Sequence, residues 1–252
     1  MFAASSQMVP APRTSKFITE GLKRHELFAS CRATAGKIVP RETVEQPFGP
    51  LMASALVLEL PQEAEILAQG EESKYCFVVK QGCVRTVRRF EDGRRQIGEF
   101  LLPGDIFGWE TLGEQEFAAE AATPVTLWRL RLSEVEARAD EDRAFAQRLR
   151  RHAAEKVRAA RSRLVVLGRL TAQERIASFL LEMRERLTTA VQATIDLPMC
   201  RTDMADYLGL TIETVSRGLT MLRRHGAITV QGTRIGIHDH AALRLAGAEW
   251  IH

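Results

Sequence analysis

The sequence predicts an α+β fold with an N-terminal antiparallel β-roll of the jelly-roll type, one long helix, and a smaller C-terminal domain of short helices and a hairpin. Three observations support this prediction. Short β-prone runs separated by glycines occupy residues 46–136, one apolar stripe of helical period follows over 137–168, and capped helices with a hairpin pattern occupy 169–252. The polar, Pro-containing start of the chain predicts a partly disordered extension over 1–45.

The β-roll prediction depends on six short runs and on the glycines between them. The runs are rich in β-branched or aromatic residues and read LVLEL, AEILA, YCFVVK, CVRTVRRF, RQIGEFL and VTLWRL. The turn glycines lie 12, 11 and 11 residues apart and are Gly70, Gly82, Gly93 and Gly104. Asp92 followed by Gly93 is typical of a hairpin turn. Short strands at this regular spacing indicate a jelly-roll sandwich.

A long helix is predicted after the β-roll, because no glycine or proline lies between Ser133 and Gly168. Its apolar positions recur every three or four residues and form one stripe: Phe145, Leu149, Ala153, Val157, Ala160, Leu164 and Leu167. A long helix with one narrow stripe usually packs on a second copy of itself, so we expect a homodimer with these residues at its interface. The alternative is that the stripe packs on the β-roll of its own chain.

A second helix is predicted after the long one, because Thr171 and Glu174 have the spacing of a capping box. The positions that follow form its buried face: Ile176, Phe179, Leu180, Met183 and Leu187. The run DLP at residues 196–198 interrupts this pattern.

Two further helices and a hairpin are predicted beyond that break. Thr202 is expected to cap a short helix over 201–208, with Gly209 in the turn that follows. Thr211 is expected to cap a helix that ends near residue 225, and the core-facing positions of this helix are Val215, Leu219 and Leu222. The run AITVQGTRIGI predicts a hairpin around residues 231–234. Together these elements make a winged helix-turn-helix.

The exposed side of the second of these helices carries residue types that read base pairs. The predicted base contacts lie near its N-terminus, the end that enters a major groove, and are Ile212, Glu213, Ser216 and Arg217. A glutamate accepts a hydrogen bond from cytosine N4 and an arginine donates two to guanine. A carboxylate one helical turn away is also expected to orient Arg217. The alternative is a solvent-exposed Glu–Arg pair that only stabilises the helix.

Polar side chains around this helix are candidates for phosphate contacts: Arg201, Thr202, Thr211, Arg223 and Arg234. The charge distribution agrees with an anionic partner. From residue 140 onward the chain has 18 Lys and Arg against 13 Asp and Glu, whereas the first 139 residues have 17 against 19. We therefore expect the C-terminal half to bind double-stranded DNA.

The run RTDMADYLGLTIETVSRGLTMLRRHGAI resembles the E-T-x-S-R recognition signature of the CRP/FNR family of transcription regulators. In that family a cyclic-nucleotide-binding-like β-roll, a dimerisation helix and a winged helix-turn-helix follow one another, and this order covers the chain beyond its extension. The resemblance implies that Glu213 and Arg217 contact a G·C pair. It also implies that Ser216 and Ile212 meet thymine in a TTGAT-N4-ATCAA palindrome.

Cys200 in LPMCRTDMADYLGL is most similar to the FixK-type branch of the family. This implies an activator of genes for microaerobic respiration or nitrogen fixation that contacts RNA polymerase. The loop from Trp109 to Phe117 is the candidate polymerase contact, and the alternative is a solvated connection.

No cofactor or metal is expected. Cyclic-nucleotide binders of this fold have an R-[ST]-A turn where this chain reads EFAAEA, and Glu116 and Glu120 would repel a phosphate there. Only Cys31 precedes Cys76, so the usual cysteine ligands of an iron–sulfur cluster are incomplete. A haem sensor needs an axial ligand, and residues 51–132 contain no histidine that could serve as one. We expect activity without a ligand, and the alternative is an unrecognised small effector in the β-roll.

The cysteines show no C-x-x-C pair and no signal peptide precedes them, which predicts reduced thiols in a cytoplasmic protein. No apolar run approaches the length of a membrane span. Cys76 and Cys83 lie in strand runs and are expected in the core. Cys200 lies next to Arg201 near a helix start, where its oxidation would place an anion near phosphates, so it is the predicted redox-sensitive site. The alternative is a partly buried cysteine without a redox role.

An enzyme is not expected. Metal-dependent enzymes with a similar β-fold need histidine and glutamate ligands on their strands, but here the histidines all lie outside the β-roll. The chain also has no nucleophile elbow, P-loop or dinucleotide fingerprint. His238 and His240 flank Asp239, which is more simply the cap of a last helix.

Overall fold

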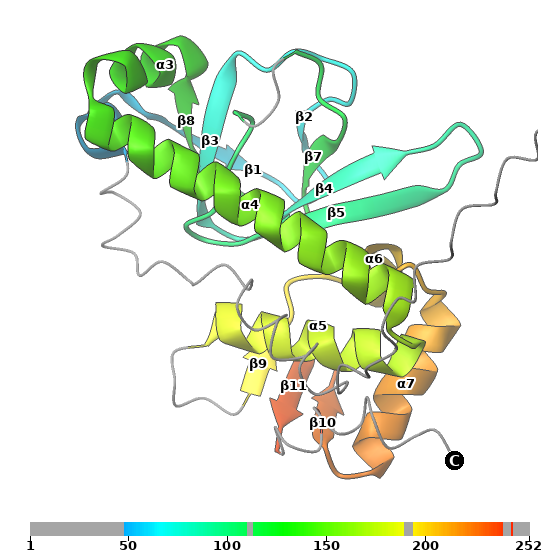
Figure 1. The fold of residues 1–252 in the computed structure, drawn as a ribbon. Helices are drawn as coiled ribbons and strands as arrows, with labels where there is room; N and C mark the ends of the chain where they lie inside the picture. Colours follow the sequence, from blue (N-terminus) through cyan, green and yellow to red (C-terminus); the bar gives the residue numbers. More distant parts are fainter. Residues whose placement is uncertain (1–47, 110–112, 189–193, 239–242, 244–252) are drawn as a thin grey trace, which may run out of the picture.

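The computed structural model describes residues 48–109, 113–188, 194–238 and 243. The predicted extension over 1–45 and the last helix after Asp239 lie outside the described residues. Figure 1 shows a β-rich domain, a long helix running along it, and a second domain of helices and short strands. The predicted fold class is confirmed by this architecture.

The β-roll consists of two antiparallel four-stranded sheets. The first has the order β1 (Leu56–Leu60), β8 (Val125–Arg131), β3 (Tyr75–Gln81) and β6 (Ile106–Phe107). The second has the order β2 (Glu65–Leu67), β7 (Ala118–Ala121), β4 (Val84–Arg89) and β5 (Arg95–Leu101). Strands β6 and β7 escaped the sequence analysis, because β6 has two residues and β7 reads AAEA, which has no β-branched residue and no apolar–polar alternation.

The core of the β-roll lies between these sheets, where Phe77 stacks on Phe107 with ring centroids 5.1 Å apart. The four predicted turn glycines all have a positive φ. At Gly82 a Cβ atom would lie 2.3 Å from the carbonyl oxygen of Pro124, so only glycine fits this close approach. The turn predictions are confirmed, including the β4–β5 hairpin at Gly93.

The region predicted as one helix is two helices. After the 3-10 helix η1 (Gly49–Ser54) and the strands come α3 (Leu132–Glu141) and α4 (Arg143–Arg169). The Asp142 carboxylate accepts hydrogen bonds from the N–H groups of Ala144 and Phe145, at 2.9 and 3.1 Å. The bond from Phe145, with that from Ala144, lowers the pKa of Asp142. The long helix therefore begins at Arg143 and not at residue 137, because Asp142 ends one helix and caps the next.

The C-terminal domain is a winged helix-turn-helix, as predicted. Its helices are α5 (Ala172–Leu187), α6 (Arg201–Leu208) and α7 (Ile212–Arg224), and its wing is the hairpin of β10 (Ile228–Gln231) and β11 (Arg234–Ile237). The capping box of Thr171 and Glu174 is confirmed. An unpredicted third strand, β9 (Thr194–Asp196), pairs with β11.

Helix α7 packs closely on α5. The three core-facing positions predicted for it are buried, and a Cβ atom at Gly218 would lie 2.4 Å from the side chain of Ile176. The small residue in mid-helix therefore serves the packing of the two helices and not a turn.

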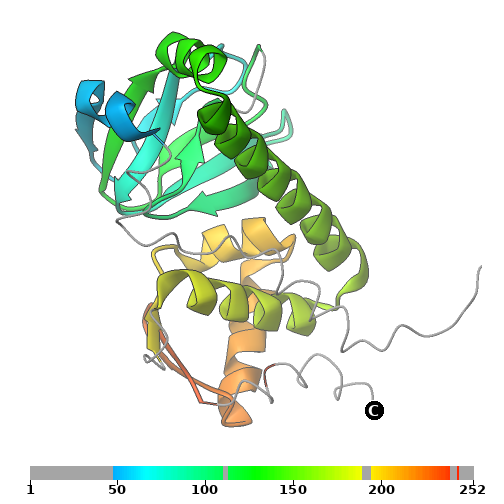
Figure 2. The same ribbon diagram turned by 60° about the vertical axis from the view of Figure 1, so that its left-hand side comes forward.

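One hydrophobic core joins the two domains. The outer face of the β4–β5 hairpin packs on α5 and α6, where the Phe100 ring lies 5.0 Å from Tyr207 and 6.3 Å from Phe179. Figure 2 shows α6 between the β-roll and α5. Burial, together with the charge of Glu182, raises the pKa of Tyr207. The helix-turn-helix is therefore docked on the β-roll and not only linked to it.

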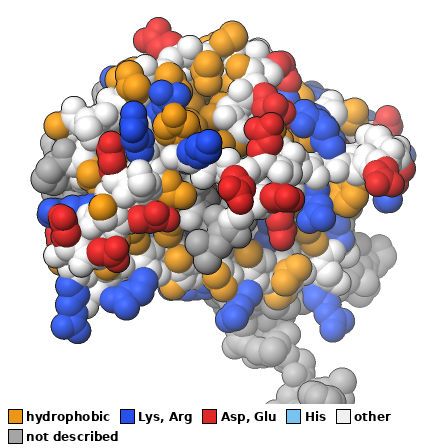
Figure 3. Space-filling model, turned by 90° about the horizontal axis from the view of Figure 1, so that it is seen from above, with side chains coloured by type: hydrophobic (Ala, Val, Ile, Leu, Met, Phe, Trp, Pro, Cys, Tyr) orange, Lys and Arg blue, Asp and Glu red, His pale blue; other side chains and the backbone are white. Residues whose placement is uncertain are grey.

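One face of the molecule is of mixed charge. Seen from above Figure 1, acidic, basic and hydrophobic side chains are interspersed on this face (Figure 3). Among the described residues, no helix is both long enough and apolar enough to span a membrane.

Candidate DNA-binding interface

The first turns of α7 expose the predicted base contacts. Thr211 caps this helix, and its hydroxyl accepts the N–H of Thr214 at 3.2 Å, as predicted. Ile212 is 42% exposed although it is a large apolar residue, and Glu213 and Arg217 are exposed beside it. Ser216 is half-buried. The opposite face of α7 is buried, so this helix has one side free to enter a groove.

The side chain of Glu213 is turned toward the start of the helix. Its own N–H group, then the Thr211 hydroxyl and the charge of Arg217, lower the pKa of this carboxyl group. Arg217 donates from Nε to the backbone carbonyl of Glu213 at 3.3 Å. The expectation that the Glu213 carboxylate orients Arg217 thus needs correction, because the backbone oxygen accepts this bond.

Helix α6 begins beside α7, and its cap differs from the prediction. Cys200 and not Thr202 is the capping residue: its Sγ accepts the N–H of Asp203 at 3.4 Å. A thiol is a weak acceptor, so the sequence pattern favoured the hydroxyl two residues later. Cys200, Arg201 and Thr202 are all exposed.

The predicted phosphate contacts lie on three elements. Arg201 on α6 approaches α7, where its Nη1 donates to the Ser216 hydroxyl at 3.4 Å. Thr211 and Arg223 lie at opposite ends of α7, 12 residues or about 18 Å apart. Arg234 lies on the wing, 3.7 Å from Asp196. The structure therefore brings Arg201 to helix α7, whereas Arg223 lies at the far end of that helix and Arg234 on the wing, both exposed.

The apolar stripe of α4 divides into two parts. Phe145 is 2% exposed and packs edge-on against Phe48 of its own β-roll, and Leu149 packs on the same cluster. The assignment of Phe145 to a dimer interface is corrected by this burial, whereas Leu149 is only half-buried. Further along the helix Val157 and Ala160 are exposed, and Leu164 is 72% exposed.

The remaining two residues of the stripe are less accessible. Ala153 and Leu167 are half-buried, and Leu167 lies beside Gly209 of the helix-turn-helix. The alternative interpretation of the stripe therefore holds for its first turns, whereas the described residues leave Val157, Ala160 and Leu164 uncovered.

The β-roll holds the two predicted core cysteines. Cys76 and Cys83 are buried, and burial raises the pKa of Cys83 to about 12, so this thiol stays protonated at neutral pH. Cys200 is exposed. Cys31 lies outside the described residues. Within the described part of the chain, no group of three or more His, Cys, Asp or Glu side chains is arranged to hold a metal ion.

The loop predicted to contact RNA polymerase is only partly exposed. Trp109 is half-buried against the cluster around Phe145, with its ring 5.8 Å from that of His152, and Phe117 is half-buried too. Gly113, Glu114 and Glu116 are exposed, and residues 110–112 lie outside the described residues.

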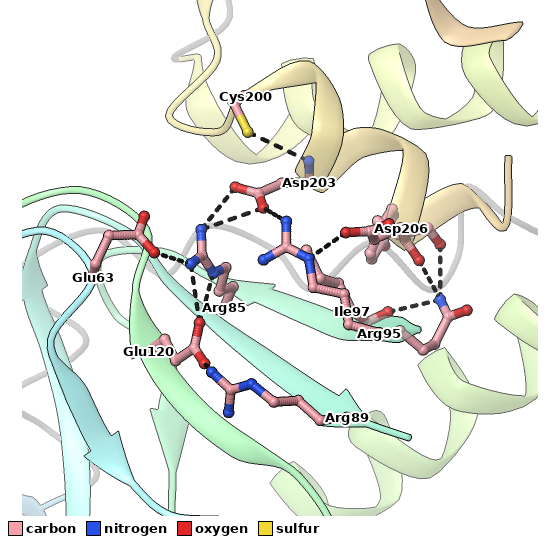
Figure 4. A network of polar contacts seen from close by, with 11 residues as sticks. Glu63, Arg85, Arg89, Arg95, Ile97, Glu120, Cys200, Asp203 and Asp206 are labelled. Carbon is pink, nitrogen blue, oxygen red and sulfur yellow. Dashed lines mark hydrogen bonds and ion pairs between the residues drawn. The ribbon is translucent and has the colours of Figure 1, made fainter. Parts of the chain in front are cut away.

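A network of buried charges escaped the sequence analysis (Figure 4). Arg85 on β4 is 4% exposed and donates to the carboxylates of Glu63, Glu120 and Asp203. Burial alone would lower the pKa of Arg85, but the hydrogen bond to Glu63 and the nearby carboxylates raise it. The strand alternation could have indicated this burial, because Arg85 is two residues from both Cys83 and Val87, which are buried.

Comparison with known proteins covers both domains. A family model described as Crp-like helix-turn-helix domain matches residues 174–246, and one described as cyclic nucleotide-binding domain matches residues 57–142. The chain is 43% identical over 187 residues to the nitrogen fixation regulation protein FixK of Azorhizobium caulinodans, which covers 73% of this chain and 75% of that protein. It is 40% identical over 196 residues to FixK of Rhizobium meliloti, covering 77% and 89%.

Among solved structures, FixK2 from Bradyrhizobium japonicum is similar with a TM-score of 0.74 and 39% sequence identity, over 77% of this chain and 98% of that one. The order of domains, the exposed recognition helix and these relatives agree. The chain belongs to the CRP/FNR family of transcription regulators, in its FixK-type branch.

Proposed function

We propose that this protein is a sequence-specific transcription activator that binds as a homodimer to a TTGAT-N4-ATCAA-like palindrome in the cytoplasm. The observation that carries the proposal is the first part of α7, where Ile212, Glu213 and Arg217 are exposed on a helix whose other face is buried. Glutamate and arginine one turn apart suit the cytosine and guanine of one base pair. Arg201 supports the site from α6 through Ser216.

Homodimerisation is supported by the uncovered part of the α4 stripe. Val157, Ala160 and Leu164 are spaced by three and four residues, which places them on one side of the helix. Burying them against the same residues of a second copy gives a two-fold symmetric pair, and a palindrome has the same symmetry.

Activity without a cyclic nucleotide is supported by the carboxylates that replace the usual phosphate contact. The Glu116 carboxylate lies 3.5 Å from the Arg88 guanidinium, and the Glu120 carboxylate forms ion pairs with Arg85 and Arg89. These arginines are already engaged with carboxylates. A phosphate entering this part of the β-roll would compete with charges of its own sign.

A second candidate function is a regulator that needs a small effector in the β-roll. It is favoured by a cavity of about 380 Å³ between β1, β2 and β3, whose walls include Leu58, Tyr75 and Phe77. Arg129 stacks on the Tyr75 ring at 4.3 Å there, and Glu71 and Glu72 also line the cavity. This candidate predicts DNA binding that rises when the effector is added.

The role of activator, with control of nitrogen fixation or microaerobic respiration, is proposed from the relatives. Two are named as nitrogen fixation regulation proteins and another as the transcriptional activator FnrL of Cereibacter sphaeroides. Contact with RNA polymerase through the exposed residues of the loop 109–117 belongs to the same proposal.

We expect reduced, ligand-free protein to bind a labelled TTGAT-N4-ATCAA duplex in an anisotropy titration at one fixed salt concentration. Swapping the G·C pair in one half-site should lower affinity about tenfold or more, because a mismatched base pair costs about 1–3 kcal/mol. Equal affinity for both duplexes would contradict the proposed site. Weak binding to both, restored by a cell extract of small molecules, would favour the second candidate.

Oxidation of Cys200 is expected to weaken this binding. The exposed thiol lies at the start of α6 beside Arg201, so a sulfenate or sulfinate there would place a negative charge next to DNA phosphates. Peroxide treatment should lower the affinity about tenfold, a loss typical of one unfavourable charge contact. The Cys200→Ser variant keeps a capping oxygen and should bind equally before and after treatment. A similar loss in that variant would assign the effect to another residue.

A further inference from the structure

The helix-turn-helix is held on the β-roll by charged side chains that the proposed DNA contacts do not use. Asp203 of α6 is 2% exposed, and its carboxylate accepts two bonds from Arg85 Nη1, at 3.0 and 3.2 Å, and one from Arg95 Nη2 at 2.8 Å. Arg95 also donates from Nε to Asp206 at 2.5 Å. We call these four residues the inter-domain cluster (Figure 4).

The cluster joins segments far apart in the sequence. Arg85 lies on β4 and Arg95 on β5, whereas Asp203 and Asp206 lie one turn apart on α6. Gln96, next to Arg95, donates to the backbone carbonyl of Asp206 at 2.5 Å. The β4–β5 hairpin therefore contacts both side chains and backbone of α6, from Asp203 to Tyr207.

The same short helix is also held from α4. Arg163 lies over the Tyr207 ring, 3.2 Å from its centroid, and donates to the backbone carbonyl of that residue. Arg175 of α5 donates to the carbonyl of Leu208 at 3.0 Å and to that of Leu167, in the last turn of α4, at 2.7 Å. Helix α6 is thus fixed between the β-roll and the helix that carries the proposed dimer stripe.

Each of these contacts restricts where α7 lies relative to α4. A dimer on a palindrome must present two recognition helices about 34–36 Å apart, and one inserted base pair rotates the second half-site by about 35°. A fixed α6 therefore selects one spacing. The cluster is fully paired within the chain, so this restriction needs no bound ligand.

We propose that Arg85, Arg95, Asp203 and Asp206 are positioning residues that set the spacing of the two DNA half-sites recognised by the dimer. This inference rests on the proposed function, because it assigns the cause of spacing preference at the same site. Asp203 also connects the cluster to Cys200, since its N–H faces the thiol while its carboxylate faces the β-roll.

The test compares affinities for the palindrome with N4 and with N5 spacers. Wild-type protein should prefer N4 strongly. In Asp203→Asn and Arg95→Gln this preference should fall about tenfold, because the two helix-turn-helix domains move more freely and the N5 site becomes accessible. The matched control is Arg94→Gln: the Arg94 side chain is 80% exposed and, among the described residues, it contacts Asp92 and the Phe90 ring of its own hairpin, so this variant should keep the wild-type preference.

A second measurement tests the contact between α6 and the β4–β5 hairpin even where a variant does not bind DNA. Amide hydrogen exchange of the DNA-free variants should accelerate in both β5 and α6 while β3 and β8 stay protected. A preference for N4 that is unchanged in folded Asp203→Asn, or exchange that is unchanged in β5 and α6, overturns the inference. Wild-type protein that does not distinguish the palindrome from its G·C-swapped form overturns the proposed function instead, and hydrogen exchange then tests the cluster alone.

Discussion

Leu164→Asp is expected to convert a dimer into a monomer and to abolish tight binding to the palindrome. Leu164 is 72% exposed and lies in the uncovered part of the α4 stripe. Burying an unpaired carboxylate in an apolar interface costs several kcal/mol, so two copies of the variant repel each other there. A monomer has one DNA-binding domain, so it loses the gain in affinity from two linked domains, which is about 10²–10⁴. Light scattering coupled to gel filtration measures the mass, and anisotropy measures the affinity.

Ala159→Asp is the matched control. Ala159 is exposed on the same helix but lies about 140° around the axis from Leu164, counted at 100° per residue. It receives the same charge at a position about 7.5 Å along the axis of α4 from Leu164. This variant should stay dimeric and bind like the wild type. A dimeric Leu164→Asp, or an equal loss in both variants, would contradict an interface along this stripe.

The elements with strong local patterns were predictable from the sequence. The helix-turn-helix has caps, a turn glycine at Gly209 in the left-handed conformation, and buried positions of helical period, and each of these signals is local. The β-roll was predictable because glycines recur at regular intervals between its strand runs, and the structure gives each of them a positive φ. Such features depend on neighbours within a few residues, which a sequence states directly.

The features that depend on distant residues were not predictable. Phe145 has the period of an interface residue, but Phe48, almost 100 residues earlier, covers it. Asp142 reads as one acid in a charged helix, and only its bonds to the next turn show that it is a cap. The carboxylate of Asp203 faces the core because Arg85, from another domain, neutralises it. For Phe145 and Asp203 a tertiary partner decided between two local possibilities, whereas at Asp142 the partners are local and the charged pattern around it hid the cap.

Arg217→Ala is expected to remove most of the discrimination between G·C and swapped half-sites. An arginine that donates two bonds to guanine contributes about 1–3 kcal/mol of selectivity, or about 5–150-fold in relative affinity. The variant should therefore bind the palindrome and its swapped form with similar, weak affinity. The Glu213→Ala variant should also lose discrimination, at the cytosine, and its affinity for unrelated DNA should rise because an exposed carboxylate is gone.

Arg223→Ala distinguishes sequence-specific base contacts from sequence-independent phosphate contacts on the same helix. Arg223 is exposed in the last turn of α7, about 9 Å along the axis from Arg217. As a phosphate contact its loss should weaken binding to every duplex by a similar factor and reduce the slope of log affinity against log salt by about 1. Arg217→Ala should instead change the ratio between duplexes. If both arginine variants changed only the salt slope, α7 would hold DNA without reading it, and the residues that select the site would lie elsewhere on the chain.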